Sequence, residues 1–123
     1  MGIIIIATTQ EILTHHLTCF GAGDLEGILS DYSEDIVFFL PDGPIKGPAA
    51  MKPFFEAMFA EFSKPGITFE LHNQSVEGDY AYIFWSADTP DNTYEAGTDT
   101  FVIRDGKIVA QSFSAKITPK AAK

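Results

Sequence analysis

Residues 95–109 read EAGTDTFVIRDGKIV, a strand pattern that runs through an Asp-Gly turn into a second strand pattern. Alternate side chains of a strand point to opposite faces of its sheet. One face of the first strand would therefore carry Asp99, Phe101 and Ile103, while threonines and an arginine would lie on the other. The segment predicts an antiparallel hairpin that turns a carboxyl group toward the core.

The rest of the chain surrounds this hairpin with helical and strand patterns. Apolar residues recur at helical spacing in three segments, at 8–20, after the N-cap candidate Asp24, and within 47–66. Strand patterns occupy 36–40, 67–76, 80–89, 94–104 and 108–117. This order predicts an α+β domain with three N-terminal helices packed on one face of a curved, mostly antiparallel sheet.

A chain of 123 residues suits a single domain, 1–123. The Ile3–Ile6 segment fits an added edge strand or a remnant of cloning, and its apolar run is too short for a signal peptide or membrane span. The single cysteine, Cys19, makes an internal disulfide impossible and favours a cytoplasmic location. No metal, nucleotide or other cofactor motif is present, so we expect no metal and no cofactor.

Charge and strand composition indicate which partners to expect. The net charge of -9 repels nucleic-acid phosphates and anionic membrane surfaces, so we expect neither as a partner. The segment 80–88, YAYIFWSAD, is apolar on both faces, although the helices cover only one. The other face needs a cover of its own, and we expect a homodimer through the sheet.

Two ionisable side chains are expected inside the core: Asp99, from strand alternation, and His16, from the apolar face of the first helix. An unpaired buried carboxylate is costly, so Asp99 must be hydrogen-bonded, paired or neutral. In a structural interpretation, Asp99 bonds to backbone amides or to His16. In a functional one, Asp99 is an acid or hydrogen-bond donor in a pocket, and His16 is a donor or proton shuttle. The sequence leaves both open.

Several other residues are candidates for the walls of such a pocket. The turn that contains Asp42 also favours Asp for backbone reasons, and an aromatic stripe at helical spacing is more often plain core. The candidate substrate-binding residues are Phe38, Asp42, Phe55, Phe59, Tyr82, Trp85 and Phe101.

Two long segments carry a resemblance to a known family. FGAGDLEGILSDYSEDIVFFLPDGPIKGPAAMKPFF at 20–55 and GTDTFVIRDGKIVAQSFSA at 97–115 resemble the ketosteroid isomerase and nuclear transport factor 2-like superfamily, which includes SnoaL-like polyketide cyclases. The resemblance covers a core of about 8–117. It implies a cone-shaped α+β roll, in which a bent sheet wraps around the helices and encloses an apolar pocket. It also implies a dimer.

The resemblance implies roles for particular residues. Asp99 matches the position where the isomerases keep a protonated Asp as an oxyanion-hole donor. His16 matches their oxyanion-hole tyrosine, and Phe55 matches a supporting tyrosine. The isomerase base is an acidic residue directly before the proline that follows the first strand. This chain has Leu40 there, with Asp42 as the nearest substitute.

The last strand also departs from the cyclase-like relatives, which often carry a His-Trp-Asp run where this chain has Gln-Ser-Phe-Ser at 111–114. Our leading hypothesis is a protein that binds a small hydrophobic molecule in the cavity, as a cofactor-independent isomerase or lyase using Asp99 and His16. The alternative is a non-catalytic ligand-binding or dimeric interaction module of the same fold.

Overall fold

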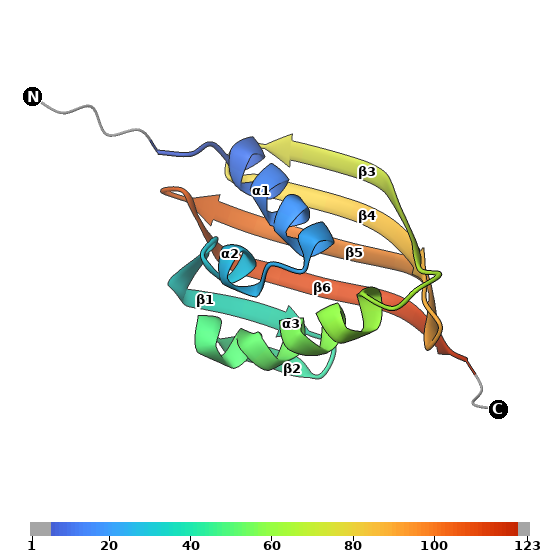
Figure 1. Cartoon of the computed structure of the whole chain (residues 1–123). Coiled ribbons are helices and arrows are strands. Elements are labelled where there is room, and N and C mark those ends of the chain that lie inside the picture. Colours follow the sequence, from blue (N-terminus) through green and yellow to red (C-terminus); the bar gives the residue numbers. More distant parts are fainter. Residues whose placement is uncertain (1–5, 121–123) are drawn as a thin grey trace, which may run out of the picture.

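The computed structural model describes residues 6–120, and this part of the chain forms three helices and six strands (Figure 1). In chain order they are α1 (Thr9–Ala22), α2 (Leu25–Leu29), β1 (Tyr32–Leu40), β2 (Gly43–Lys46), α3 (Pro48–Phe62), β3 (Thr68–Glu77), β4 (Tyr80–Asp88), β5 (Asn92–Arg104) and β6 (Lys107–Pro119). The edge strand expected at Ile3–Ile6 falls mostly outside the described residues, and Ile6 itself is exposed and belongs to no strand.

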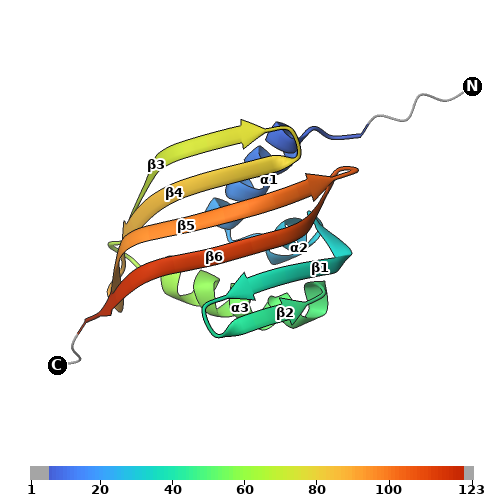
Figure 2. The same cartoon turned by 180° about the vertical axis from the view of Figure 1, so that it is seen from behind.

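All six strands belong to one curved, unclosed sheet in the order β2-β1-β6-β5-β4-β3. Strand β1 runs parallel to β6, and the other neighbouring pairs are antiparallel. The three helices cover the same face of this sheet (Figure 1), and the view from behind shows the opposite face without a helix (Figure 2). These observations confirm the predicted α+β class with helices on one face of a mostly antiparallel sheet.

The sheet bends where the pairing of its long strands shifts by a residue. Such shifts occur between Leu71 and Asn73 in β3 and between Tyr94 and Ala96 in β5. An extra residue in one strand of a pair bends that strand and increases its twist. The bends curve the sheet toward the helices, which gives the predicted cone its hollow side.

The edge strand β2 was not predicted, because the sequence there reads as a Pro-Asp-Gly-Pro turn. Only Pro41 and Asp42 form the loop, and the chain then pairs back on β1, with Leu40 opposite Gly43 and Phe39 opposite Pro44. A proline has no N–H to offer a neighbouring strand, so it is tolerated in a strand at the edge of a sheet. Its presence hid a short strand that follows the usual hairpin geometry.

Helix α1 covers most of the predicted range 8–20 and continues to Ala22, and both of its ends are capped. The Thr8 side chain accepts a hydrogen bond from the Glu11 backbone N–H, and the Glu11 carboxylate accepts one from the Thr8 backbone N–H, which completes a capping box. Gly23 ends the helix in the left-handed conformation, at φ 66°. The buried face of the helix includes His16, as its helical spacing predicted. Within residues 6–120, no helix has the length and apolar character needed to cross a bilayer.

Strand β4 shows which face of the sheet forms the core. Ala81, Ile83, Trp85 and Ala87 are buried, and the alternate residues are exposed or only partly buried. The buried set faces the helices, where it joins a core that includes the fully enclosed side chains Leu13, Phe38, Met51 and Phe101. The alternation of β4 therefore divides the sheet into an inner face and an outer face.

Candidate functional site

A small cavity of about 60 Å³ lies between α1, α3 and the inner face of the sheet. Its walls are largely aromatic and aliphatic, and polar atoms reach it from a few side chains. The lining residues are His16, Leu17, Phe20, Phe54, Phe55, Met58, Phe62, Phe69, Ile83, Trp85, Asp99, Phe101, Gln111 and Phe113. An apolar pocket with a few convergent polar groups is the usual form of a small-molecule site.

Asp99 is the carboxyl group of this cavity, and only 8% of the residue is exposed. Trp85 Nε1 donates a hydrogen bond to its Oδ2 over 3.0 Å, and Gln111 Nε2 donates one to its Oδ1 over 2.9 Å. The partners are therefore two side chains from the neighbouring strands, and not the backbone amides or His16 that the structural interpretation expected. The backbone of β5 pairs with β4 and β6 on both sides, which leaves its own amides unavailable to the carboxyl group.

Burial raises the pKa of the Asp99 carboxyl group above its ordinary value of 3.8. The hydrogen bonds from Trp85 and Gln111 and the charge of His16 act in the opposite direction, but they do not outweigh the loss of hydration. Burial therefore makes Asp99 easier to protonate than an exposed aspartate, and a protonated Asp99 can donate a hydrogen bond toward the cavity.

The Trp85 ring lies flat against the backbone of the neighbouring strand. A Cβ atom at Gly97 would come within 2.4 Å of the Trp85 ring, so only glycine fits opposite it. On the cavity side, Trp85 is stacked with Phe113, with ring planes 12° apart and centroids 6.2 Å apart. This placement aims Nε1 at Asp99 and gives the cavity a flat aromatic wall.

His16 reaches the cavity from α1, and its ring nitrogens face two further polar residues. Nε2 lies 3.4 Å from the Tyr32 hydroxyl, which donates to Gln111 Oε1. Nδ1 lies 3.5 Å from Asp31 Oδ2. Burial raises the pKa of Tyr32 well above its ordinary value, and the nearby carboxyl groups of Asp99 and Asp31 add to the effect. The Tyr32 hydroxyl therefore keeps its proton and can both donate and accept.

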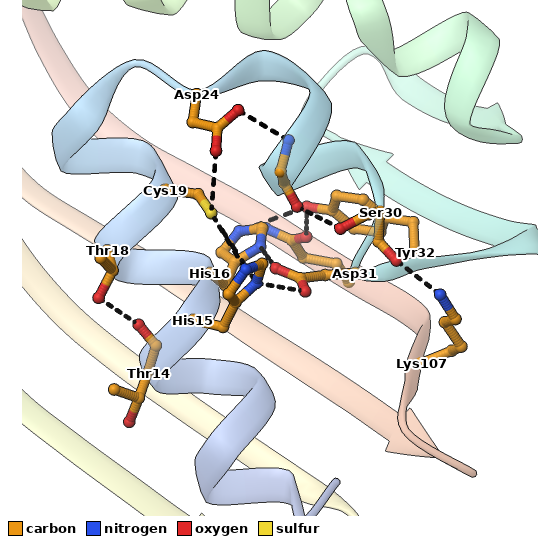
Figure 3. A network of polar contacts seen from close by, with 12 residues as sticks. Thr14, His15, His16, Thr18, Cys19, Asp24, Ser30, Asp31, Tyr32 and Lys107 are labelled. Carbon is orange, nitrogen blue, oxygen red and sulfur yellow. Dashed lines mark hydrogen bonds and ion pairs between the residues drawn. The ribbon is translucent and has the colours of Figure 1, made fainter. Parts of the chain in front are cut away.

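Asp31, directly before β1, contacts both histidines of α1 through its two carboxylate oxygens (Figure 3). His15 Nδ1 is 2.7 Å from Asp31 Oδ1, and Cys19 Sγ is 3.5 Å from His15 Nε2. The side chain of Asp31 is 5% exposed, whereas that of His15 is 51% exposed. In the described part of the chain, no three His, Cys, Asp or Glu side chains are grouped as a metal site requires.

The structure brings together five of the nine predicted site residues. His16, Phe55, Trp85, Asp99 and Phe101 line one cavity. The His16 ring meets both Phe55 and Phe101 edge-on, at centroid distances of 6.2 and 5.3 Å. The candidate donors and part of the predicted wall are therefore neighbours.

The other four predicted residues lie elsewhere. Tyr82 pairs with Thr100 on the outer face, because the alternation that turns Trp85 inward turns Tyr82 outward. Asp42 is exposed in the β1–β2 turn. Phe38 is enclosed against Phe54 behind the cavity, and Phe59 lines a separate hollow beside α1.

Sequence analysis missed three polar residues of the site, Asp31, Tyr32 and Gln111. Gln111 lies two and four residues before Phe113 and Ala115 on the last strand, so all three side chains point to the same face. Alternation could therefore have placed Gln111 on the inner face. Tyr32 and Gln111 are 79 residues apart, and their hydrogen bond is set by the parallel pairing of β1 with β6. No local pattern predicts that pairing.

Comparison with known families agrees with this architecture. Residues 13–111 match a family described as the SnoaL-like domain. No curated protein matches the chain. The family match spans every element from α1 into β6 and includes each of the polar residues that meet in the cavity.

Solved structures share the fold at low sequence identity. The epoxide hydrolase/cyclase-like enzyme SalBIII, which has a role in pyran ring formation in the polyether salinomycin, superposes with a TM-score of 0.75 at 16% identity, over 91% of this chain and 95% of that chain. A Kribbella flavida protein provisionally assigned as a ketosteroid isomerase superposes with a TM-score of 0.72 at 15% identity, over 98% of this chain and 87% of that chain. An NTF2-like protein of unknown function from Cytophaga hutchinsonii superposes with a TM-score of 0.70 at 15% identity, over 94% of this chain and 95% of that chain.

The raised pKa of Asp99 predicts a pH dependence of stability. The folded state holds the Asp99 proton more tightly than the unfolded state does. The stability that this proton contributes is therefore fully present below pH 3.8, and it is lost as the pH rises through the raised pKa of Asp99 in the folded protein. Asp99→Asn removes this titration. The free energy of unfolding of the wild type, relative to the variant, should fall with rising pH and then level off. Urea denaturation of both proteins across this range measures the difference, and a difference that is constant or increases with pH would contradict the assignment.

Proposed function

Since the chain belongs to the SnoaL-like domain family, we propose that it binds a small, largely apolar molecule in the cavity and polarises one oxygen atom of that molecule with Asp99. The observation that carries the proposal is a buried carboxyl group that faces an apolar cavity while Trp85 and Gln111 donate to both of its oxygens. While Gln111 keeps this orientation, the proton of a neutral Asp99 has no fixed partner except a ligand.

The walls favour a flat, apolar ligand. Trp85 and Phe113 present parallel rings, and Phe54 and Phe101 add aromatic surface around the carboxyl group. Benzene occupies an engineered cavity of about 150 Å³, which exceeds the 60 Å³ found here. A ring of that size therefore requires movement of a partly buried side chain, and Met58 of α3 is an unbranched one.

The chemistry that fits this geometry is polarisation of a carbonyl or epoxide-like oxygen. A donor aimed at an oxygen that becomes negative in the transition state stabilises that state by about 2.7–4 kcal/mol. Such help suits a cofactor-independent isomerase or lyase that shifts a proton or opens a carbon–oxygen bond. The cyclase-like role of SalBIII in pyran ring formation involves a ring oxygen, which supports the same class of substrate.

His16 is the second functional group in this proposal. It lies beside the cavity wall and reaches Asp99 through Tyr32 and Gln111. Its imidazole can accept or return a proton while Asp99 holds the ligand oxygen. Leu40 occupies the position where the resemblance puts the isomerase base, so proton transfer in this chain would depend on His16 and Asp99.

A binding module without turnover is the second candidate. Leu40 favours it, because an apolar side chain there supplies no base at the expected place. The two candidates make the same prediction for ligand binding and different predictions for reaction. They can be separated with one set of variants.

Binding can be measured with phenol and toluene, which have similar size and differ by one hydroxyl group. The chain has one tryptophan, Trp85, so its fluorescence reports on the cavity wall. We expect the wild type to bind phenol at least about tenfold more tightly than toluene, since one buried hydrogen bond of about 1.4 kcal/mol gives that ratio. Asp99→Leu should abolish the preference, while Asp42→Leu in the exposed turn should keep it. Equal affinity of the wild type for both compounds would refute the proposal.

Turnover can be measured on the same proteins with 2-cyclohexenone in deuterated water. Polarisation of its carbonyl group accelerates exchange of the acidic C–H protons, which NMR follows directly. An enzyme should accelerate exchange in the wild type and lose the effect in Asp99→Leu. If the wild type prefers phenol to toluene but does not accelerate C–H exchange in 2-cyclohexenone, the protein is the non-catalytic binding module.

We also propose that the outer face of the sheet is covered by a second copy of the chain. It carries no helix (Figure 2), and its large side chains Phe39 and Tyr80 are 49% and 55% exposed. A stable interface buries about 800 Å² on each partner, which an open sheet face can supply. Aromatic side chains such as these are enriched in interfaces between proteins.

A charge placed on that face tests the dimer. Tyr82→Glu places one carboxylate from each copy of the chain in the expected interface, where the two like charges repel each other. Lys52→Glu also introduces a glutamate, but on the exposed side of α3 and away from that face. Analytical ultracentrifugation should give a dimer for the wild type and for Lys52→Glu, and a monomer for Tyr82→Glu. A monomeric wild type would contradict the proposal.

A further inference from the structure

A series of buried polar side chains leads away from Asp99. Gln111 Nε2 donates to Asp99 Oδ1, and the Tyr32 hydroxyl donates to Gln111 Oε1. The His16 ring lies on the far side of that hydroxyl, with Nε2 3.4 Å from the oxygen. Beyond the ring, Nδ1 faces Asp31 Oδ2 at 3.5 Å. All five residues are buried, so their protons must be placed between neighbours and not on water.

In the orientation seen in the structure, the Gln111 amide fixes the roles of the groups on both sides. Its N–H points at Asp99, so Asp99 Oδ1 accepts, and without a ligand oxygen nothing accepts a proton from Asp99. Its carbonyl oxygen takes the proton of Tyr32, which leaves the Tyr32 oxygen to accept from His16 Nε2–H. This orientation therefore suits an ionised Asp99 and a His16 that carries a proton on Nε2.

A half-turn of the amide exchanges its oxygen and nitrogen, which are alike in size. Asp99 then donates to the Gln111 carbonyl oxygen, and the Gln111 N–H donates to the Tyr32 oxygen. The Tyr32 hydroxyl turns its proton toward His16 Nε2, which must now be bare. The reversed orientation suits a neutral Asp99 and a His16 without a proton on Nε2.

We propose that Gln111 is a two-position switch through which Asp99 and His16 share a single proton and hold opposite protonation states. Gln111 and Tyr32 are positioning residues in this scheme, because they act on the two candidate catalytic groups and not on the ligand. The proposal deepens the proposed function and rests on it for the role of a ligand, whereas the sharing itself is a property of the protein alone.

Asp31 sets the number of protons. Within residues 6–120, His16 Nδ1 and Asp31 Oδ2 are the two buried side-chain atoms that lack a hydrogen-bond partner, and they face each other. A proton on Nδ1 is attracted to the carboxylate in either orientation of Gln111. His16 thus carries protons on both nitrogens when Asp99 has none, and on Nδ1 alone when Asp99 has one. The exchange moves one proton from His16 Nε2 to Asp99 Oδ1, so the total is unchanged.

Any other number of protons leaves the series mismatched. With one proton more, Asp99 and His16 Nε2 are both protonated, and the Tyr32 hydroxyl proton then points at the His16 Nε2–H. With one proton fewer, Asp99 and His16 Nε2 are both bare, and the Tyr32 oxygen faces a nitrogen that has no proton to donate. Two facing donors or two facing acceptors in a buried site lose a hydrogen bond and keep the cost of desolvation. The state with one shared proton is therefore the one in which every group of the series has a matching partner, and in this scheme the pair exchanges protons with the solvent as a unit.

The surroundings offer no competing partner for this proton in the described part of the chain. The groups that face the pair are Asp31 and Tyr32 at the start of β1, Phe55 on α3, Trp85 on β4 and Gln111 on β6. His15 and Cys19 on α1 lie one step further away, since His15 contacts Asp31 and Cys19 contacts His15. Burial raises the pKa of Tyr32 well above its ordinary value, so its hydroxyl stays neutral and serves as a connector. His15 already bonds Asp31 through the other carboxylate oxygen (Figure 3).

The shared proton gives the cavity both an acid and a base. Without a ligand, reversal of the amide lets either residue be the one that lacks a proton. A chain with Leu40 at the family's base position still has a proton acceptor in this way.

NMR on the ligand-free protein tests the switch. The ¹³C signal of the Asp99 carboxyl carbon and the ¹⁵N signal of His16 Nε2 each report their own proton. In the wild type, we expect both signals to change in the same two steps as the pH is varied, because each step belongs to the pair. Gln111→Met removes both hydrogen bonds at similar side-chain volume, and each signal should then change in a single step of its own. Tyr32→Phe breaks the series at the next connection and should act in the same way.

Ser86→Ala is the control, since it removes a hydrogen bond to His72 on the outer face and should keep the two shared steps. Separate single steps in the wild type would overturn the proposal, as would shared steps that survive both Gln111→Met and Tyr32→Phe. Circular dichroism checks that each variant is folded. Because no ligand is used, failure of this test leaves the phenol and cyclohexenone results valid, and failure of those leaves this result valid.

Discussion

The desolvated carboxyl group of Asp99 is the constraint on which the cavity depends. Removing such a group from water costs several kcal/mol unless it is neutral or hydrogen-bonded, and this one is both held by two donors and raised in pKa by burial. Trp85 can donate only because its ring lies flat over Gly97, where no Cβ fits. Gln111 can donate only while its carbonyl oxygen is occupied by Tyr32. The cavity wall and the polar series follow from that one group.

The fold supplies the setting for this group and leaves the chemistry to individual residues. The bent sheet and the helices on its inner face enclose the cavity, but solved structures with this fold include an epoxide hydrolase/cyclase-like enzyme and a protein provisionally assigned as a ketosteroid isomerase, so the fold alone does not indicate a reaction. This chain has Leu40 where the resemblance to the isomerases implies a base, and it has a histidine pair that meets Asp31. The functional argument therefore depends on where protons lie between Asp99 and His16, and not on a borrowed mechanism.

The sequence predicted the features that depend on local periodicity. Strand alternation turned Asp99 inward and helical spacing turned His16 inward, because each element repeats the same geometry along its length. Pro44 concealed strand β2, since a proline at a sheet edge resembles a turn. The contact of Tyr32 with Gln111 was out of reach, because it depends on how distant strands pair. Tyr82 was assigned to the pocket wall although it shares no face with Trp85, and alternation applied strictly would have placed it outside.

Infrared spectroscopy of the wild type and Asp99→Asn tests most directly whether Asp99 holds a proton in the folded protein. At about pH 5.5, an ordinary aspartate is almost fully ionised and gives no absorption from a neutral carboxyl group. The account predicts that the wild type retains a neutral-carboxyl band at this pH, from molecules in which Gln111 is reversed and Asp99 holds the shared proton, and that Asp99→Asn lacks it. Identical spectra of the two proteins in that region would mean that this state is not populated, and the assignment of Asp99 as a hydrogen-bond donor would be wrong.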